Sequence, residues 1–145
     1  MKQFIITLLF TAFFGTSSFA GQKDPVNSSV LESFNKSFNN AKDVQWSASN
    51  EVYKATFLYN CQYITAFYTA GGELMGITKN ILSSQLPLLL QAGLKENYSG
   101  YWISDVVEYS NQDEISYYVS LENADSKLTI RSSQNNWSVY RKVSK

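Results

Sequence analysis

The feature that most constrains this fold is the segment 52–76, which holds three strand-like runs separated by very short connections. The first two runs are residues 52–59 and 62–69, and both show the alternation of side chains that is typical of strands. Gly71 and Gly72 lie between the second run and a third at 74–78, and glycine supplies the positive φ angles that a tight hairpin needs. The segment therefore predicts an antiparallel meander.

The two long runs also predict which face of the meander is buried. One face carries the set Tyr53, Ala55, Phe57, Ile64, Ala66 and Tyr68. The opposite face carries Lys54, Thr56, Leu58, Tyr63, Thr65 and Phe67. Because lysine and threonine favour water, we expect the first set to pack in the core and the second set to form the wetter face.

Two helices are predicted to cover this core. The first begins near Ser28, where Ser29 and Glu32 have the spacing of a capping box, and its apolar face is Val30, Leu31, Phe34 and Phe38. The second begins near Ser84, with Pro87 in its first turn and Leu86, Leu90 and Leu94 four residues apart. A short strand is expected at 44–46, and four more are expected at 101–109, 115–122, 127–132 and 137–143.

The two parts of the chain repeat the same order of elements. Each part gives a helix, a strand with a tryptophan (Trp46 or Trp102) and a three-stranded meander. Equating Ser28 with Ser84 gives a period of about 56 residues. The predicted fold is therefore α+β: a tandem repeat of a helix plus an antiparallel β-meander, over about 28–80 and 84–143. Both helices are expected to pack on one face of an antiparallel sheet.

The first twenty residues are predicted to be a secretory signal peptide, leaving one domain over 21–145. Lys2 gives a positive start, residues 4–14 are an apolar run, and small residues precede a cleavage site after Ala20. A run of about 11 residues is too short to cross a bilayer, which needs about 20. We expect a periplasmic or secreted protein with no stable membrane anchor after cleavage.

The net charge bears on the kind of partner, and the number of cysteines bears on how the fold is stabilised. The chain has 12 basic and 12 acidic residues, so losing Lys2 leaves 11 against 12 and a net charge of −1. Nucleic acid is therefore not an expected partner, because such binding needs a basic surface. Cys61 is the single cysteine, so an internal disulfide is excluded and stability must come from apolar burial.

No catalytic or metal-binding pattern is found in the sequence. The chain has no histidine, which excludes Ser-His-Asp and Cys-His pairs and the usual zinc sites. Cys61 lacks a base, and Asp113 and Glu114 lie in a predicted turn where carboxylates are usually solvated. The expectation is a protein that is not an enzyme and uses no cofactor.

Several motifs resemble those of the secreted PepSY-like family of bacterial periplasmic proteins, whose fold is described as like that of the β-lactamase inhibitor protein (BLIP-like). The matching residues run from Val30 to about Arg141 and have three main parts. They are Phe34-x3-Phe38-x2-Ala41-x2-Val44-x-Trp46, then Tyr53-x-Ala55-x-Phe57 with Ala66-x-Tyr68-x3-Gly72, then Leu86-Pro87 with residues 94–103. The resemblance implies export and a tandem helix-plus-meander fold, in a family mostly without an assigned role. The inhibitor's paired cysteines are absent, and no inhibitory residue carries over.

The wetter face of the sheet is the predicted partner-binding surface. Aromatic side chains with an arginine are common at recognition surfaces. The candidate residues are Tyr63, Phe67, Leu58, Lys54, Tyr118, Arg131 and Tyr140. An alternative is that these residues only fill cross-strand contacts or a dimer interface.

The predicted function is an exported, non-enzymatic module that recognises a protein or peptide through this face, with inhibition as one form of that role. The alternatives are a cell-envelope hydrolase that uses scattered carboxylates, and a purely structural or self-associating module.

Overall fold

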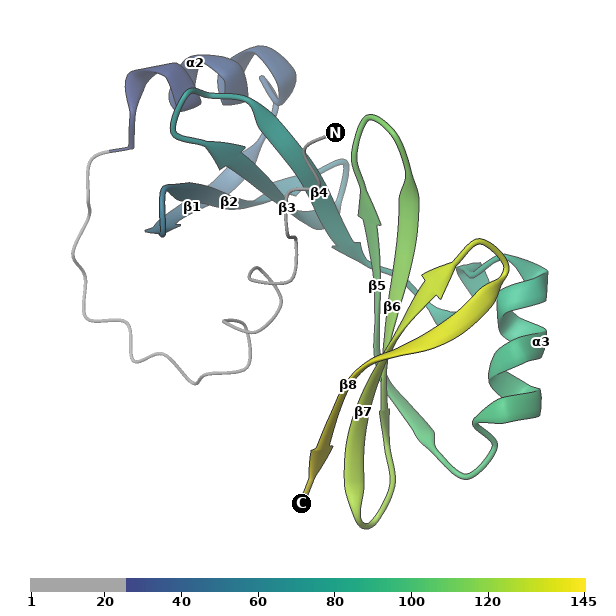
Figure 1. The fold of residues 1–145 in the computed structure, drawn as a ribbon. Coiled ribbons are helices and arrows are strands. Elements are labelled where there is room, and N and C mark those ends of the chain that lie inside the picture. Colours follow the sequence, from purple (N-terminus) through teal and green to yellow (C-terminus); the bar gives the residue numbers. More distant parts are fainter. Residues whose placement is uncertain (1–25) are drawn as a thin grey trace.

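The computed structural model describes residues 26–145, in which eight antiparallel strands form one sheet with two α-helices beside it (Figure 1). The strands follow one another in the sheet in chain order, from β1 to β8. The predicted signal peptide, residues 1–20, lies outside the described residues. No helix within residues 26–145 is long and apolar enough to cross a membrane. The elements are α2 Ser28–Ser37, β1 Lys42–Ser49, β2 Val52–Tyr59, β3 Gln62–Thr69, β4 Leu74–Asn80, the 3-10 helix η1 Ser83–Gln85, α3 Leu88–Asn97, β5 Trp102–Ser110, β6 Ile115–Glu122, β7 Ser126–Ser133 and β8 Asn136–Ser144.

The start of α2 is fixed by Asn27 and not by the predicted capping box at Ser29. The Oδ1 atom of Asn27 accepts a hydrogen bond from the Ser29 amide at 3.1 Å, so Asn27 satisfies a free amide at the helix start. Its Nδ2 atom donates to the Ala70 carbonyl at 2.9 Å, which ties the helix to the turn between β3 and β4. Gly72 in that turn has φ +86°, and a Cβ there would lie 2.5 Å from the Ser29 carbonyl oxygen.

The first apolar cluster lies between α2 and strands β2 and β3. Its fully or almost fully buried members are Val30, Phe34, Ala55, Phe57, Ala66 and Tyr68. The Phe34 ring meets the Phe57 ring edge-on, with centroids 5.0 Å apart. The set of residues that the sequence predicted for the core face of β2 and β3 is thus on the buried side.

The second helix begins later than predicted, at Leu88 and not near Ser84. Leu86 has ψ 150°, because the ring of Pro87 disfavours the helical conformation in the residue before it. Ser83–Gln85 forms only a short 3-10 helix, and Pro87 is the residue before the first helical position. A second cluster is buried beside α3: Leu86, Leu94, Val106, Val119, Leu121, Leu128 and Ile130.

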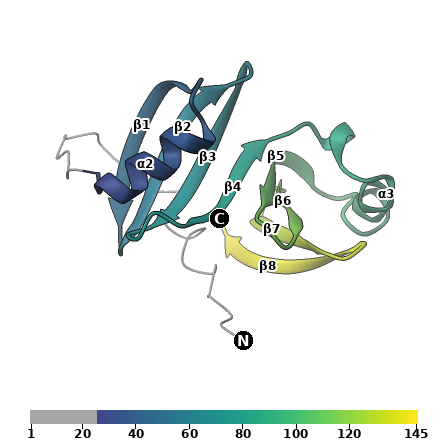
Figure 2. The same cartoon turned by 90° about the horizontal axis from the view of Figure 1, so that it is seen from above.

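The sheet is continuous, with α2 beside its first strands and α3 beside its last strands (Figure 2). The buried apolar residues form two separate clusters. The strands that join the two parts, β4 and β5, pair only over Ile77–Asn80 and residues 107–110. At this junction Lys79 Nζ lies 3.1 Å from Glu108 Oε1. The junction therefore holds a short ladder and an ion pair, and the buried residues of the two clusters do not join into one core there.

A candidate binding surface on the sheet

Each predicted site residue lies outside the buried cluster of its part of the sheet, on the side of its strand that we call the helix-distal face. Residues paired across an antiparallel ladder point to the same side. The register pairs Lys54 with Phe67 and Leu58 with Tyr63. All four alternate along their strands with buried residues of the first cluster, so they lie on the opposite side of the sheet.

The structure does not gather the seven candidates into one cluster. The first group is Lys54, Leu58, Tyr63 and Phe67 on β2 and β3, and the second is Tyr118, Arg131 and Tyr140 on β6, β7 and β8. Strands β4 and β5 separate the groups. Any partner that touches both groups must therefore span the middle of the sheet.

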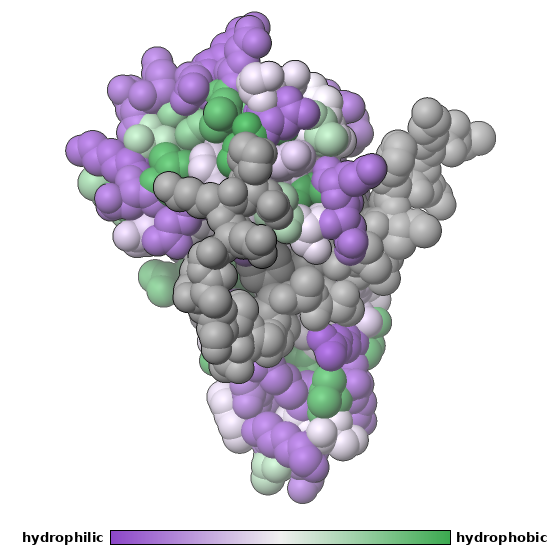
Figure 3. Space-filling model, turned by 90° about the vertical axis from the view of Figure 1, so that its left-hand side faces the viewer, coloured by the Kyte–Doolittle hydropathy of each residue, from purple (hydrophilic) through white to green (hydrophobic). Residues whose placement is uncertain are grey.

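The prediction that the aromatic residues of this face are exposed is right for Tyr63 and wrong for two others. Tyr63 is 61% exposed, whereas Phe67 is 6% and Tyr118 3% exposed. Phe67 lies opposite Lys54, and burial lowers the pKa of this lysine. Hydrophobic and hydrophilic residues are interspersed on the side of the molecule shown in Figure 3.

Tyr118 is buried because the other members of the second group pack on it. The Tyr140 ring stands edge-on to the Tyr118 ring, with centroids 5.5 Å apart. The guanidinium carbon of Arg131 lies 5.7 Å from the centre of the Tyr118 ring. Burial raises the pKa of Tyr118, and the charge of Arg131 partly opposes this rise. Tyr118 is therefore a support for Arg131 and Tyr140, which are both half-buried.

Arg131 is also held by Glu114, a residue that the sequence suggested was merely solvated. Arg131 Nη2 donates to Glu114 Oε1 at 2.8 Å and to Ser116 Oγ at 3.3 Å. These residues line part of a cavity of about 310 Å³ together with Ser138. Turn composition gave no signal for this contact, because it joins Glu114 in the turn before β6 to Arg131 within β7, 17 residues away in the chain.

Tyr109 is a second residue of this face that sequence reasoning missed. It is 6% exposed, and its hydroxyl donates to the Met75 carbonyl at 3.0 Å. The register pairs Tyr109 with Thr78 across β4 and with Ser116 across β6, between the two candidate groups. The ring packs directly on Gly76, whose missing side chain makes room for it.

Metal-binding side chains do not gather in the part of the chain that the structure describes. Within residues 26–145, no group of three or more Asp, Glu, Cys or His side chains is placed to hold a metal ion. Cys61 is exposed in the turn between β2 and β3, where its φ is +63°. The helix-distal face thus holds one exposed tyrosine, an arginine in an ion pair and rings packed beside that arginine.

Comparisons with known proteins identify the fold. A scan against protein-family models found no match, and a search of curated proteins also found none. Among solved structures, the chain is similar to a predicted periplasmic protein from Bacteroides eggerthii, with 15% identity, TM-score 0.74 and coverage of 83% of this chain and 89% of that chain. A BLIP-like protein from Bacteroides fragilis is 16% identical with TM-score 0.69, covering 83% of this chain and 86% of that one. A DUF2874 family protein from Bacteroides ovatus is 15% identical with TM-score 0.73, and the coverage is 83% and 89%.

Proposed function

We propose that this chain is an exported, non-enzymatic module that binds a protein or peptide through the helix-distal face. The observation that carries the proposal is Tyr63, which is 61% exposed on a strand whose cross-strand neighbour on that face is Leu58. An exposed tyrosine offers a large apolar surface and a polar tip at low entropic cost, which suits a contact residue. Arg131, fixed by Glu114, adds a directed charge at the other end of the face.

The BLIP-like fold supports a binding role by analogy. One similar structure is described as BLIP-like and another as predicted to be periplasmic. Export of this chain and inhibition of a secreted hydrolase fit these descriptions. Export and inhibition are therefore parts of the proposal, because similarity at 15% sequence identity supports the fold and not the function.

We further infer that the chain is a PepSY-like tandem repeat with a spacing of 60 residues in its helical part, in place of 56. The helices Ser28–Ser37 and Leu88–Asn97 have equal lengths and corresponding ends. The Phe38 amide donates to the Phe34 carbonyl at 2.8 Å, as the Tyr98 amide does to the Leu94 carbonyl at 3.0 Å. The same spacing makes Trp46 equivalent to Val106. Trp46 packs against the first buried cluster, and Val106 is a member of the second.

Photo-crosslinking tests the binding role. A photoreactive phenylalanine at Tyr63 should trap a partner in cells, and the same group at Leu88, which is 81% exposed on α3, should not. Replacing Leu58 and Arg131 with serine should abolish the crosslink at Tyr63 while circular dichroism remains unchanged. Equal trapping from Tyr63 and Leu88 would refute the assignment of this face.

An activity panel tests the non-enzymatic part. Purified protein should not turn over peptide, ester or glycoside substrates of the cell envelope. Turnover that co-purifies with the protein and is lost in a carboxylate variant would support the hydrolase instead.

A further inference from the structure

We propose that the outer edge of β8, with the cavity between β8 and α3, binds an extended acidic peptide segment of another protein, which adds to the sheet as a further strand. This site lies at the edge of the sheet, and its argument does not depend on the binding role proposed for the helix-distal face. The argument uses the backbone of β8, its charges and the cavity beside it.

The outer edge of β8 is available for pairing among the described residues. β8 is the last strand of the sheet and pairs only with β7 (Figure 2). In an antiparallel ladder, alternate residues direct their N–H and C=O groups away from the neighbouring strand. The Lys145 amide donates to the Asp125 carbonyl at 2.9 Å, which makes Lys142 and Ser144 the outward-directed residues at this end. Such a row of unpaired groups is a template for an added strand.

The charges along β8 favour an acidic partner. Arg141 and Lys142 are exposed, and neither forms an ion pair with a carboxylate within residues 26–145. Lys145, by contrast, lies 3.1 Å from Glu122. Two neighbouring cations on an edge therefore lack a counter-charge, and carboxylates on an added strand would supply it.

The same charges disfavour a second copy of the chain as the occupant. An antiparallel pairing of two β8 strands centred on Arg141 would bring the arginine and Lys142 of each copy close together. Like charges opposite one another across a strand pair are destabilising. An acidic segment meets no such repulsion.

A cavity of about 310 Å³ adjoins the beginning of β8 and is suited to a side chain of the added strand. Its lining residues are Gly93, Asn97, Tyr98, Asn135, Asn136 and Trp137. The side-chain carboxamides of Asn135 and Asn136 make no hydrogen bond within residues 26–145, so their N–H groups remain for a carboxylate or amide of the peptide. Tyr, Trp, Asn and Gly are also the residue types that dominate adaptable binding surfaces.

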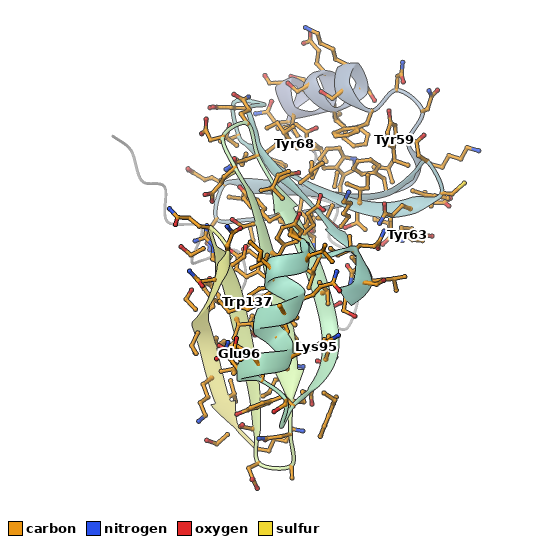
Figure 4. All side chains as sticks on the ribbon, turned by 90° about the vertical axis from the view of Figure 1, so that its right-hand side faces the viewer. Tyr59, Tyr63, Tyr68, Lys95, Glu96 and Trp137 are labelled. Atoms are coloured by element: carbon orange, nitrogen blue, oxygen red, sulfur yellow. The ribbon has the colours of Figure 1, made fainter. Side chains whose placement is uncertain are left out.

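The wall of this cavity is held in place before any ligand binds. Trp137 Nε1 donates to the Leu90 carbonyl of α3 at 2.8 Å, and Figure 4 shows the tryptophan where the helix meets the strand. Gly93 permits this approach, because a Cβ there would lie 3.2 Å from the indole Cδ1. Val139, two residues on, faces the same side and is 60% exposed, so an added strand gains an apolar contact as well.

Nuclear magnetic resonance titration tests the proposal. The probe is an acetylated nine-residue peptide in which glutamate alternates with valine and threonine. We expect the amide signals of β8 and of the α3 cavity to shift and the outward amides of β8 to gain protection from hydrogen exchange. The double variant Arg141→Glu/Lys142→Glu should bind at least tenfold more weakly. The matched control Lys36→Glu/Lys42→Glu changes the same charge in the other part of the chain, and it should bind within twofold of the native protein.

Three results would overturn the proposal. The first is equal binding of a peptide N-methylated at alternate residues, because methylation keeps the charge but prevents strand pairing. The second is a failure of charge selectivity: a peptide with lysine in place of each glutamate binds equally well, or the glutamate peptide does not bind at millimolar concentration. The third is a concentration-dependent dimer in sedimentation that the Arg141→Glu/Lys142→Glu change strengthens, which would make a second copy the occupant.

Discussion

Replacing Gly76 with alanine tests how tightly Tyr109 packs at the middle of the sheet. A Cβ at Gly76 would lie 2.6 Å from Cε2 and Oη of Tyr109 and 2.7 Å from its Cζ. Ordinary van der Waals contact begins at 3.4 Å, so the ring must move. Tyr109 is only 6% exposed and its hydroxyl holds the Met75 carbonyl, so movement would break that hydrogen bond.

The expected loss of stability follows from three contributions. Overpacking a buried site costs about 1–3 kcal/mol, and losing a buried hydrogen bond costs about 1 kcal/mol. Alanine restricts the unfolded chain and returns about 0.5–1 kcal/mol. We expect Gly76→Ala to lower the free energy of unfolding by about 2 kcal/mol, or the melting temperature by about 8 °C.

Urea unfolding followed by far-ultraviolet circular dichroism measures this change. Gly100→Ala is the matched control, because a Cβ at that position meets nothing within 4 Å. It should alter the free energy of unfolding by less than about 0.5 kcal/mol. Adding Tyr109→Leu to Gly76→Ala should recover part of the loss, since the shorter side chain removes the clash. A Gly76→Ala variant as stable as the Gly100→Ala control would refute the reasoning.

Three further predictions concern single side chains. Tyr68→Phe should raise stability by about 1 kcal/mol in urea unfolding, because the buried Tyr68 hydroxyl has no hydrogen-bond partner within residues 26–145. Burial raises the pKa of Tyr68 from 10.0 to about 12. The unfolded chain therefore loses the Tyr68 proton first, and the free energy of unfolding of the native protein should fall as the pH rises from 10 to 12. The Tyr68→Phe variant has no such group and should lose less stability in that range. Glu51→Gly should stabilise by about 1 kcal/mol in thermal unfolding, since Glu51 has φ +64° in the turn between β1 and β2, and a lower melting temperature would contradict this. Hydrogen bonds from Lys145 and Lys127 lower the pKa of Glu122 below 4.5, so native stability should fall as pH drops below 4.5, and Glu122→Gln should fall less steeply.

Local patterns were sufficient to predict the strands with strong alternation. The predicted runs 52–59, 62–69 and 115–122 coincide with β2, β3 and β6. In each run the alternating side chains and the turn residues that end the strand are close together in the sequence, so a local pattern defines the whole strand. Strand β1 was predicted only at 44–46 but spans Lys42–Ser49. Its polar ends are held by backbone pairing to β2, which a side-chain pattern does not reveal.

Contacts between distant strands could not be predicted. The faces of Tyr63 and Tyr118 follow from alternation, whereas their exposure depends on what packs over them. Tyr118 is covered by Tyr140 from a strand two positions away in the sheet, and this contact depends on a register shift at Thr129. The ion pair of Arg131 with Glu114 likewise depends on the register of β6 and β7.

The sequential order of the strands has a consequence for how the chain folds. Every strand from β2 to β8 pairs with the strand that precedes it in the chain, and the longest connection, residues 81–101 between β4 and β5, contains α3. Loops that close between neighbours have a small entropic cost, and local contacts of this kind accompany fast folding. A chain synthesised from its N-terminus can therefore complete α2 and β1–β4 before β5 exists, and β8 is the last strand to arrive.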